Sequence, residues 1–274
     1  MKLFILLPSL LLCLLFLNSC ESEEPIVADI DEIVVEAYLF EGQTADSIKI
    51  SRVIPFNAES ELPGISSLAP TITDQNGNVY PLEYQGDDFY YHIHELRIEQ
   101  GQTYSFSLMY NGKEITAQTF VPAPATELVL SATTIGRTLI NDISDLQSQI
   151  QPEPFQVSWT GDPGAYYFVE VTNIETSPSP INELAAELER PPLPQIQTAP
   201  STEQTYRLDA RREINYFGRH EIVIYTVTPE YVLLYEEPGD GLGGLTENRT
   251  NISNGFGVFT GITSVRDTFL VVSQ

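Results

Sequence analysis

The chain has 274 residues, of which 38 are acidic and 13 are basic, so its formal net charge at pH 7 is −25. This excess of acid argues against a nucleic-acid partner, because binding to phosphates depends on Lys and Arg side chains that displace counterions. Hydrophobic residues make up 42% of the chain. That share is enough for a packed core, so the charge does not indicate a wholly disordered protein.

The first twenty residues have the pattern of an exported, lipid-modified protein. Lys2 is followed by an almost continuously apolar stretch over residues 3–17 and then by Asn18-Ser19-Cys20. The stretch is short for a membrane span and is typical of a signal peptide. We therefore predict a lipoprotein signal peptide over residues 1–19 and an acylated Cys20 that attaches the chain to membrane lipid. The alternative is a buried strand or helix that ends in Cys20.

The segment after Cys20 is acidic and has no regular apolar period. Glu21, Glu23 and Glu24 follow Cys20, and no Lys or Arg occurs between Lys2 and Lys49. We predict that residues 20–29 form an acidic lipidated tether rather than part of a packed fold.

Alternation of apolar and polar residues predicts an N-terminal β-sandwich over residues 30–121. Asn76-Gly77 and Asn111-Gly112 each lie between two such segments, and this dipeptide favours type I′ turns with two positive φ angles. The expected strands are 33–40, 47–53, 71–74, 79–84, 104–110 and 114–120.

A Pro-rich link at residues 121–126 leads to a second β-rich unit, residues 127–274. We expect Trp159 to be a buried core residue, in a pattern similar to the second strand of fibronectin type III domains. One short helix is expected from Ile181 to Arg190, inside an insertion at about 174–203, and a second helix over residues 230–237. The fold class predicted is mainly β, with two tandem immunoglobulin/fibronectin III-like β-sandwiches and two short helices inserted in the second. The expected strands of this unit are 128–133, 155–160, 166–172, 205–208, 221–227 and 268–272.

No motif in the chain indicates catalysis, a cofactor or a metal. Nucleophile elbows, zinc-protease helices and phosphate-binding loops are missing from the sequence. His92 and His94 share one face of an expected strand, but no third ligand lies near them in sequence, so an exposed polar face is favoured. Asp74, Asn76 and Asn78 imitate the start of a calcium loop, and a hairpin turn explains them better. We expect no enzyme activity.

Several segments together resemble a known family of Bacteroidota lipoproteins, those carrying domain of unknown function 4249 (DUF4249). The most specific is the ending Asn254-Gly255-Phe256-Gly257-Val258-Phe259; others are residues 33–42, 46–50, 101–104, 111–113, 120–122 and 166–167. The resemblance implies an outer-membrane lipoprotein with tandem β-sandwich domains, often encoded beside a TonB-dependent receptor. The acidic run after Cys20 also resembles the signal that exports such lipoproteins to the cell surface; a periplasm-facing anchor is the alternative.

The function expected is that of a surface-exposed, non-catalytic binding or accessory subunit, working with a TonB-dependent β-barrel receptor. Alternatives are a structural or assembly lipoprotein of the cell envelope and a hydrolase acting on glycans. The hydrolase would require two converging carboxylates, or a third ligand beside His92 and His94. Candidate binding residues are Tyr90, Tyr91, Asn254 and Phe256. Further aromatics that could stack on sugar rings, although alternation places most of them in the core, are Tyr166, Tyr167, Tyr216 and Phe217.

Overall fold

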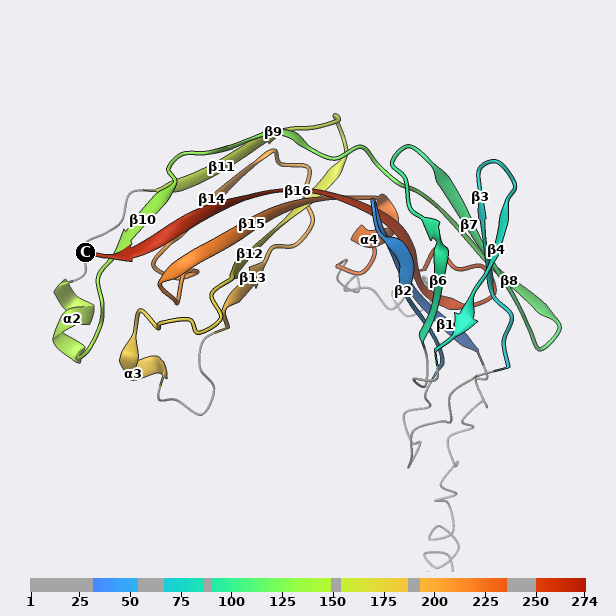
Figure 1. The fold of residues 1–274 in the computed structure, drawn as a ribbon, viewed down its shortest axis with the longest axis horizontal. Helices are drawn as coiled ribbons and strands as arrows, with labels where there is room; N and C mark the ends of the chain where they lie inside the picture. Colours follow the sequence, from blue (N-terminus) through green and yellow to red (C-terminus); the bar gives the residue numbers. More distant parts are fainter. Residues whose placement is uncertain (1–31, 54–66, 86–89, 149–153, 187–192, 236–249) are drawn as a thin grey trace, which may run out of the picture.

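The structure is a computed structural model that describes residues 32–53, 67–85, 90–148, 154–186, 193–235 and 250–274 (Figure 1). The predicted signal peptide, the acidic tether and Cys20 lie outside the described residues. The same holds for the side chains of residues 90–94, of which only the backbone is described.

The described chain is mainly β, as the sequence predicted. Burial alternates strictly along β1, whose odd-numbered residues from Ile33 to Leu39 are fully buried. This is the pattern of a strand with one face on a core. The strands of the N-terminal part are β1 (Ile33–Phe40), β2 (Thr44–Arg52), β3 (Thr71–Asp74), β4 (Val79–Pro81), β5 (Glu83–Tyr84), β6 (Tyr90–Arg97), β7 (Thr103–Tyr110) and β8 (Lys113–Phe120).

The C-terminal part contains eight further strands and three short helices in its described residues. The sequence predicted two helices and missed α2 (Ile143–Ser148). The described helical residues of the other two are α3 (Glu183–Ala186) and α4 (Pro229–Val232), and α4 is shorter than expected. The strands are β9 (Thr126–Leu130), β10 (Thr134–Arg137), β11 (Phe155–Thr160), β12 (Tyr166–Asn173), β13 (Gln195–Gln197), β14 (Thr205–Leu208), β15 (Gly218–Val227) and β16 (Phe256–Ser273).

The strands form three sheets. The largest has nine strands in the order β13-β12-β15-β16-β1-β2-β6-β5, with β10 also paired to β16. One hydrophobic core joins the β1–β2 region of this sheet to the four-stranded sheet β4-β3-β7-β8. A second core joins the β12–β15 region to the three-stranded sheet β14-β11-β9, and Trp159 lies in it with only 6% of its surface exposed, as predicted.

The last strand, β16, belongs to both parts of the molecule. Residues Phe256–Ile262 pair in parallel with β1, and residues Ile262–Val271 pair antiparallel with β15. The sequence assigned the whole C-terminal segment to the second unit and predicted a strand only over 268–272. Residues 258–263 are buried on both faces of the sheet, so the apolar/polar alternation that marks a half-buried strand is missing there.

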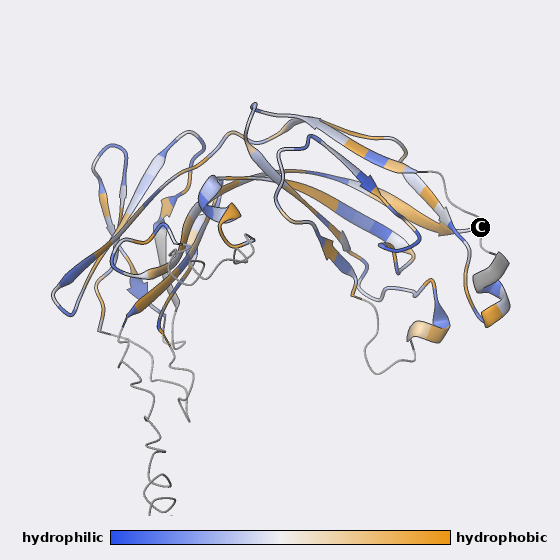
Figure 2. Ribbon diagram, turned by 180° about the vertical axis from the view of Figure 1, so that it is seen from behind, coloured by the Kyte–Doolittle hydropathy of each residue, from blue (hydrophilic) through white to orange (hydrophobic). Residues whose placement is uncertain are grey.

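The continuous sheet gives the molecule the shape of an arch (Figure 1). The nine-stranded sheet lies on the inner side of the arch, and the two smaller sheets lie on the outer side. The helix α4 lies on the inner side, near the middle of β16. The alternation of apolar and polar residues along the strands is visible in Figure 2.

The two Asn-Gly turns differ. Asn111 and Gly112 have φ angles of 48° and 75°, as the predicted type I′ turn requires. The type I′ prediction for Asn76-Gly77 is wrong, because of these two only Gly77 has a positive φ. The carboxylate of Asp74 accepts the N–H groups of Asn76 and Asn78, each at 2.9 Å, and so folds a longer turn that ends at Gly77.

Candidate binding site

The four binding residues suggested by the sequence do not form one described site. Tyr90 and Tyr91 lie on β6, which pairs with β2 and β5, but their side chains are outside the described residues. Phe256 is the first residue of β16 and Asn254 lies two residues before it; β16 pairs with β1 and not with β6. Their role in binding therefore stays a prediction.

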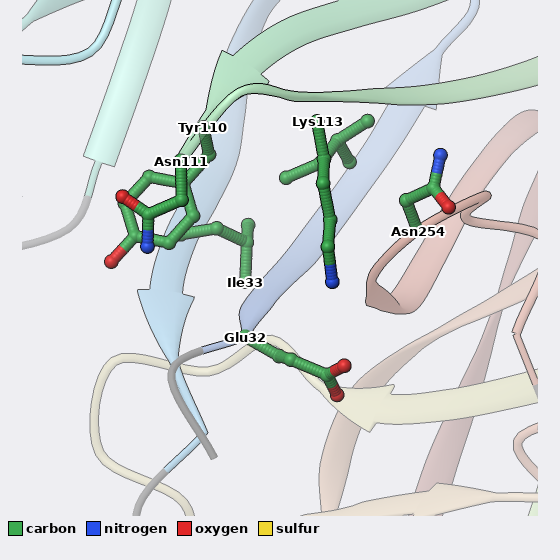
Figure 3. Close-up of a pocket in the computed structure, with 7 residues that line it drawn as sticks. Glu32, Ile33, Tyr110, Asn111, Lys113 and Asn254 are labelled. Carbon is green, nitrogen blue, oxygen red and sulfur yellow. The ribbon is translucent and has the colours of Figure 1, made fainter. Parts of the chain in front are cut away.

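Asn254 lines a small cavity at the edge of the N-terminal core (Figure 3). Its volume is about 120 Å³, space for a few water molecules but well below the several hundred Å³ of a typical small-molecule pocket. Figure 3 shows the side chains of Lys113 and Glu32 extending toward each other, with Asn254 beside them. Asn254 also donates a hydrogen bond through Nδ2 to the carbonyl oxygen of Glu114 at 2.8 Å. The remaining lining residues are Ile33, Tyr110, Asn111 and Ile115.

The residues around Asn254 have a structural explanation. The side chain of Asn251 donates to the carbonyl oxygen of Phe259 at 2.7 Å and accepts the N–H of Phe259 at 2.9 Å, as a neighbouring strand would. Gly257 has a φ of 106°, and a Cβ there would lie 2.0 Å from the carbonyl oxygen of Val35. Glycine therefore allows β16 to lie against β1, and the specific sequence of this ending is explained by packing.

A second candidate site lies on the face of the nine-stranded sheet that points away from both cores. Seven aromatic residues gather there, and we call them the aromatic cluster. None of its tyrosines except Tyr166 was named as a binding candidate from the sequence. They come from β1, β12, β15, α4 and the turn after α4: Tyr38, Phe40, Tyr166, Phe168, Tyr225, Tyr231 and Tyr235.

Strand register explains why residues so distant in sequence meet. Phe40 of β1 is paired with Ile262 of β16, Ile262 with Val227 of β15, and Val227 with Tyr166 of β12. Paired residues on neighbouring strands point to the same face, so these four side chains form one row across the sheet. Tyr225 and Phe168 are paired in a parallel row.

The rings of the aromatic cluster pack closely. Phe168 stacks on Tyr225 with ring centroids 4.5 Å apart, and on Tyr231 of α4 at 5.2 Å. Tyr38 meets Tyr231 edge to face at 6.3 Å. Phe168 and Tyr231 are buried, whereas Tyr38 and Tyr225 are half-buried and Tyr235 is 43% exposed. The cluster thus has a packed centre and accessible rings around it.

Three phenol groups of the cluster, those of Tyr38, Tyr225 and Tyr231, remain protonated at neutral pH. Burial is the main cause that raises the pKa of Tyr38, Tyr225 and Tyr231. Nε2 of Gln197 donates to the hydroxyls of Tyr231 and Tyr235 at 3.3 and 3.4 Å, and these hydroxyls lie 3.3 Å apart. Each phenol is therefore available as a hydrogen-bond donor and acceptor.

In the part of the chain that the structure describes, no three His, Cys, Asp or Glu side chains are grouped so that they could hold a metal ion. The side chains of His92 and His94, which the sequence raised as possible ligands, fall outside that part. None of the helices within the described ranges is both long enough and apolar enough to cross a membrane.

Comparisons with solved structures returned distant similarities. A crystal structure of titin domains is 12% identical, with a TM-score of 0.20, over 71% of this chain and 59% of the titin chain. A DUF4785 family protein from Legionella pneumophila is 11% identical, with a TM-score of 0.21, over 70% of this chain and 52% of the other. No curated protein matches the sequence.

A family model matches the chain over most of its length. The model described as "Domain of unknown function (DUF4249)" matches residues 23–268, nearly the whole chain and both of its cores. The match includes the Asn-Gly-Phe-Gly-Val-Phe ending that joins β16 to β1. The protein belongs to the DUF4249 family.

Proposed function

We propose that this protein is a lipid-anchored, non-catalytic binding or accessory protein on the surface of a Bacteroidota outer membrane, acting with a TonB-dependent β-barrel receptor. In this proposal Cys20 carries the lipid and residues 20–29 form the tether. Two tandem immunoglobulin/fibronectin III-like sandwiches then present a binding surface to the outside. The acidic chain lacks the Lys- and Arg-rich segments that attract anionic lipids, so acylation supplies the attachment.

The observation that carries the binding role is the aromatic cluster. Large rings that remain partly exposed are typical of recognition surfaces, because they bury much area with little loss of side-chain entropy. Tyr38 lies in the N-terminal part of the sheet and Tyr166 in the C-terminal part, so the surface exists only when β16 joins the two. A surface built on one continuous sheet is preorganised, which lowers the entropic cost of binding.

Metabolic labelling with an alkyne fatty acid, followed by membrane fractionation, tests the anchor. Cys20→Ala should abolish labelling and release the protein from the membrane, because no other residue of the signal motif can be acylated. Cys13→Ala is the matched control, since Cys13 lies inside the apolar stretch and should leave labelling unchanged. Equal labelling of the Cys20→Ala variant would exclude the anchor.

Extraction in a mild native detergent tests the accessory role. We expect a membrane β-barrel to co-purify with the full chain and to disappear from the preparation when Cys20→Ala releases the protein. Protease digestion of intact cells should remove the wild-type protein if it is displayed on the surface. Repeated extractions that recover no β-barrel would overturn the accessory role.

A further inference from the structure

The accessible rings of the aromatic cluster surround a packed centre. Tyr225 stacks on Phe168 with ring centroids 4.5 Å apart and keeps part of its surface in solvent. Tyr38 and Tyr166 are also half-buried, and Tyr235 is 43% exposed. The C–H groups on one side of a pyranose ring form an apolar patch that packs on an aromatic ring. Several such rings on one sheet face therefore match consecutive units of a sugar chain.

Two carboxylates around the cluster form ion pairs within the protein, and a third, Glu170 of β12, lies on the same sheet face as Phe168 and acts electrostatically on Tyr225. Glu36, beside Tyr38 on β1, forms an ion pair with Lys49 of β2 at 3.2 Å. On the other side of the cluster, Glu221 forms an ion pair with Arg266 at 3.5 Å. The cationic groups near the rings are thus already paired, and this disfavours an anionic ligand on a protein of net charge −25.

Polar groups that suit sugar hydroxyls lie at the rim of the same surface. The hydroxyls of Tyr231 and Tyr235 and the amide of Gln197 form a small network with separations of 3.3–3.4 Å. These separations are longer than those of strong O–H···O bonds, so the groups can exchange them for bonds to a ligand. Phenols and an amide together offer both donors and acceptors without a net charge.

We infer that the aromatic cluster is a binding surface for a neutral oligosaccharide. This inference rests on the proposed binding function and names its ligand class. Tyr38, Tyr166 and Tyr225 stack on sugar rings, while Gln197 and Tyr235 hydrogen-bond to sugar hydroxyls. Because β1 contributes Tyr38 and β12 contributes Tyr166, the ligand spans the junction between the two parts of the sheet.

The test measures binding of defined oligosaccharides to the acylated full chain in detergent by isothermal titration calorimetry. The neutral probes are the hexasaccharides of cellulose, starch, xylan and mannan; the charged probes are an oligogalacturonate and hexalysine. We expect at least one neutral hexasaccharide to bind and both charged probes to bind more weakly. Stronger binding of either charged probe would overturn the assignment of the ligand class.

Variants connect the binding to the cluster. Tyr235→Ala and Tyr38→Ala should each weaken binding of the neutral probe about threefold to tenfold, the usual effect of one lost ring contact. Tyr80→Ala is the control, because this half-buried tyrosine lies on β4 of the outer four-stranded sheet. Circular dichroism establishes that each variant is folded. Equal weakening by all three variants would show that the cluster is not the site.

Saccharide binding can fail independently of the accessory role, and the experiments distinguish the two failures. Should none of the neutral hexasaccharides bind while Cys20-dependent anchoring and β-barrel co-purification persist, the cluster is a packing feature and the accessory role stands. Should anchoring fail while a neutral hexasaccharide still binds with loss in Tyr235→Ala, the proposed location is wrong and the saccharide site stands.

Discussion

Replacing Gly257 by Ala tests the close contact between β16 and β1. An added Cβ would lie 2.0 Å from the carbonyl oxygen of Val35, 2.8 Å from its carbonyl carbon and 2.9 Å from its nitrogen. All three are backbone atoms, so no side chain can rotate away. Ordinary contacts begin near 3.4 Å, so the two strands would have to move apart by about 1.4 Å locally.

The cost has two parts. Alanine at a φ of 106° loses about 1–2 kcal/mol relative to glycine through backbone strain. Moving the strands apart weakens two or three ladder hydrogen bonds at about 1 kcal/mol each. We therefore expect the free energy of unfolding to fall by about 3–5 kcal/mol, a large share of the 5–15 kcal/mol that is usual for a folded protein.

Equilibrium urea unfolding of the full chain measures this loss. Gly77→Ala is the matched control, because Gly77 has a φ of 83° and no atom within 4 Å of its added Cβ; it should lose only about 1–2 kcal/mol, the strain alone. Trp159, the single tryptophan, reports on the second core. Because β16 crosses both parts, the urea midpoint measured by Trp159 fluorescence should shift together with the midpoint measured by circular dichroism. Equal losses in the two variants, or an unchanged Trp159 midpoint, would refute the reasoning.

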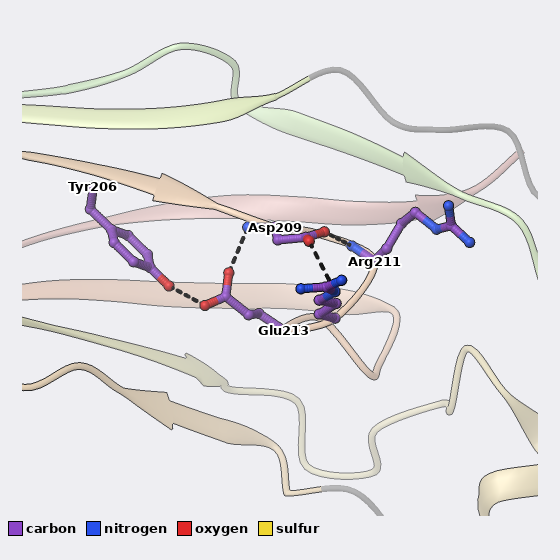
Figure 4. Close-up of polar contacts among 5 residues, drawn as sticks. Tyr206, Asp209, Arg211 and Glu213 are labelled. Carbon is purple, nitrogen blue, oxygen red and sulfur yellow. Dashed lines mark hydrogen bonds and ion pairs between the residues drawn. The ribbon is translucent and has the colours of Figure 1, made fainter.

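Three further predictions concern packing and ionisation. Tyr206→Phe should lower the free energy of unfolding by about 1–3 kcal/mol, because Tyr206 donates a 2.6 Å hydrogen bond to the carboxylate of Glu213 (Figure 4). Chemical denaturation measures this loss, and an unchanged free energy of unfolding would contradict the prediction. Burial lowers the pKa of His220 below its ordinary 6.5, so the unfolded chain binds the proton more readily and stability falls as pH drops through 6.5, by at most about 1.4 kcal/mol per pH unit. His220→Gln should reduce that slope between pH 7 and 5, and an unchanged slope would show that other groups cause it. Phe168→Ala, at a buried ring, should lower the free energy of unfolding by about 3–5 kcal/mol, whereas Phe120→Ala, at an exposed ring, should change it by no more than about 0.5 kcal/mol. Thermal unfolding measures both, and similar shifts of the melting temperature would argue against a packed cluster.

The sequence alone was sufficient for features that depend on neighbouring residues. Alternation located β1 and β3 with their observed bounds, and the Asn111-Gly112 dipeptide located a type I′ turn. Trp159 was correctly placed in a core. The family resemblance was equally a property of local segments, and the family model confirms it. Each of these is signalled by residues that are close together in the sequence.

Features that depend on distant partners were decided by the tertiary structure. The first half of β16 went unrecognised because it is covered on both faces, which removes the alternation that marks a strand at a surface. The turn at Asn76 was misjudged for a local reason, because the carboxylate of Asp74, two residues earlier, accepts the hydrogen bonds that close it. The conformational preferences of these residues do not specify which strand or side chain they pair with.

The aromatic cluster shows the same division most clearly. The sequence named Tyr166 as a ring that could contact a sugar, but gave no reason to join it to Tyr38, more than a hundred residues earlier. The register of β1, β16, β15 and β12 brings the two regions onto one face. The sequence by itself therefore determined strands such as β1 and β3, the turn at Asn111-Gly112 and the family. The folded chain decided which rings share a surface, because strand pairing between distant segments is set by the packing of whole sheets and not by the residues next to each ring.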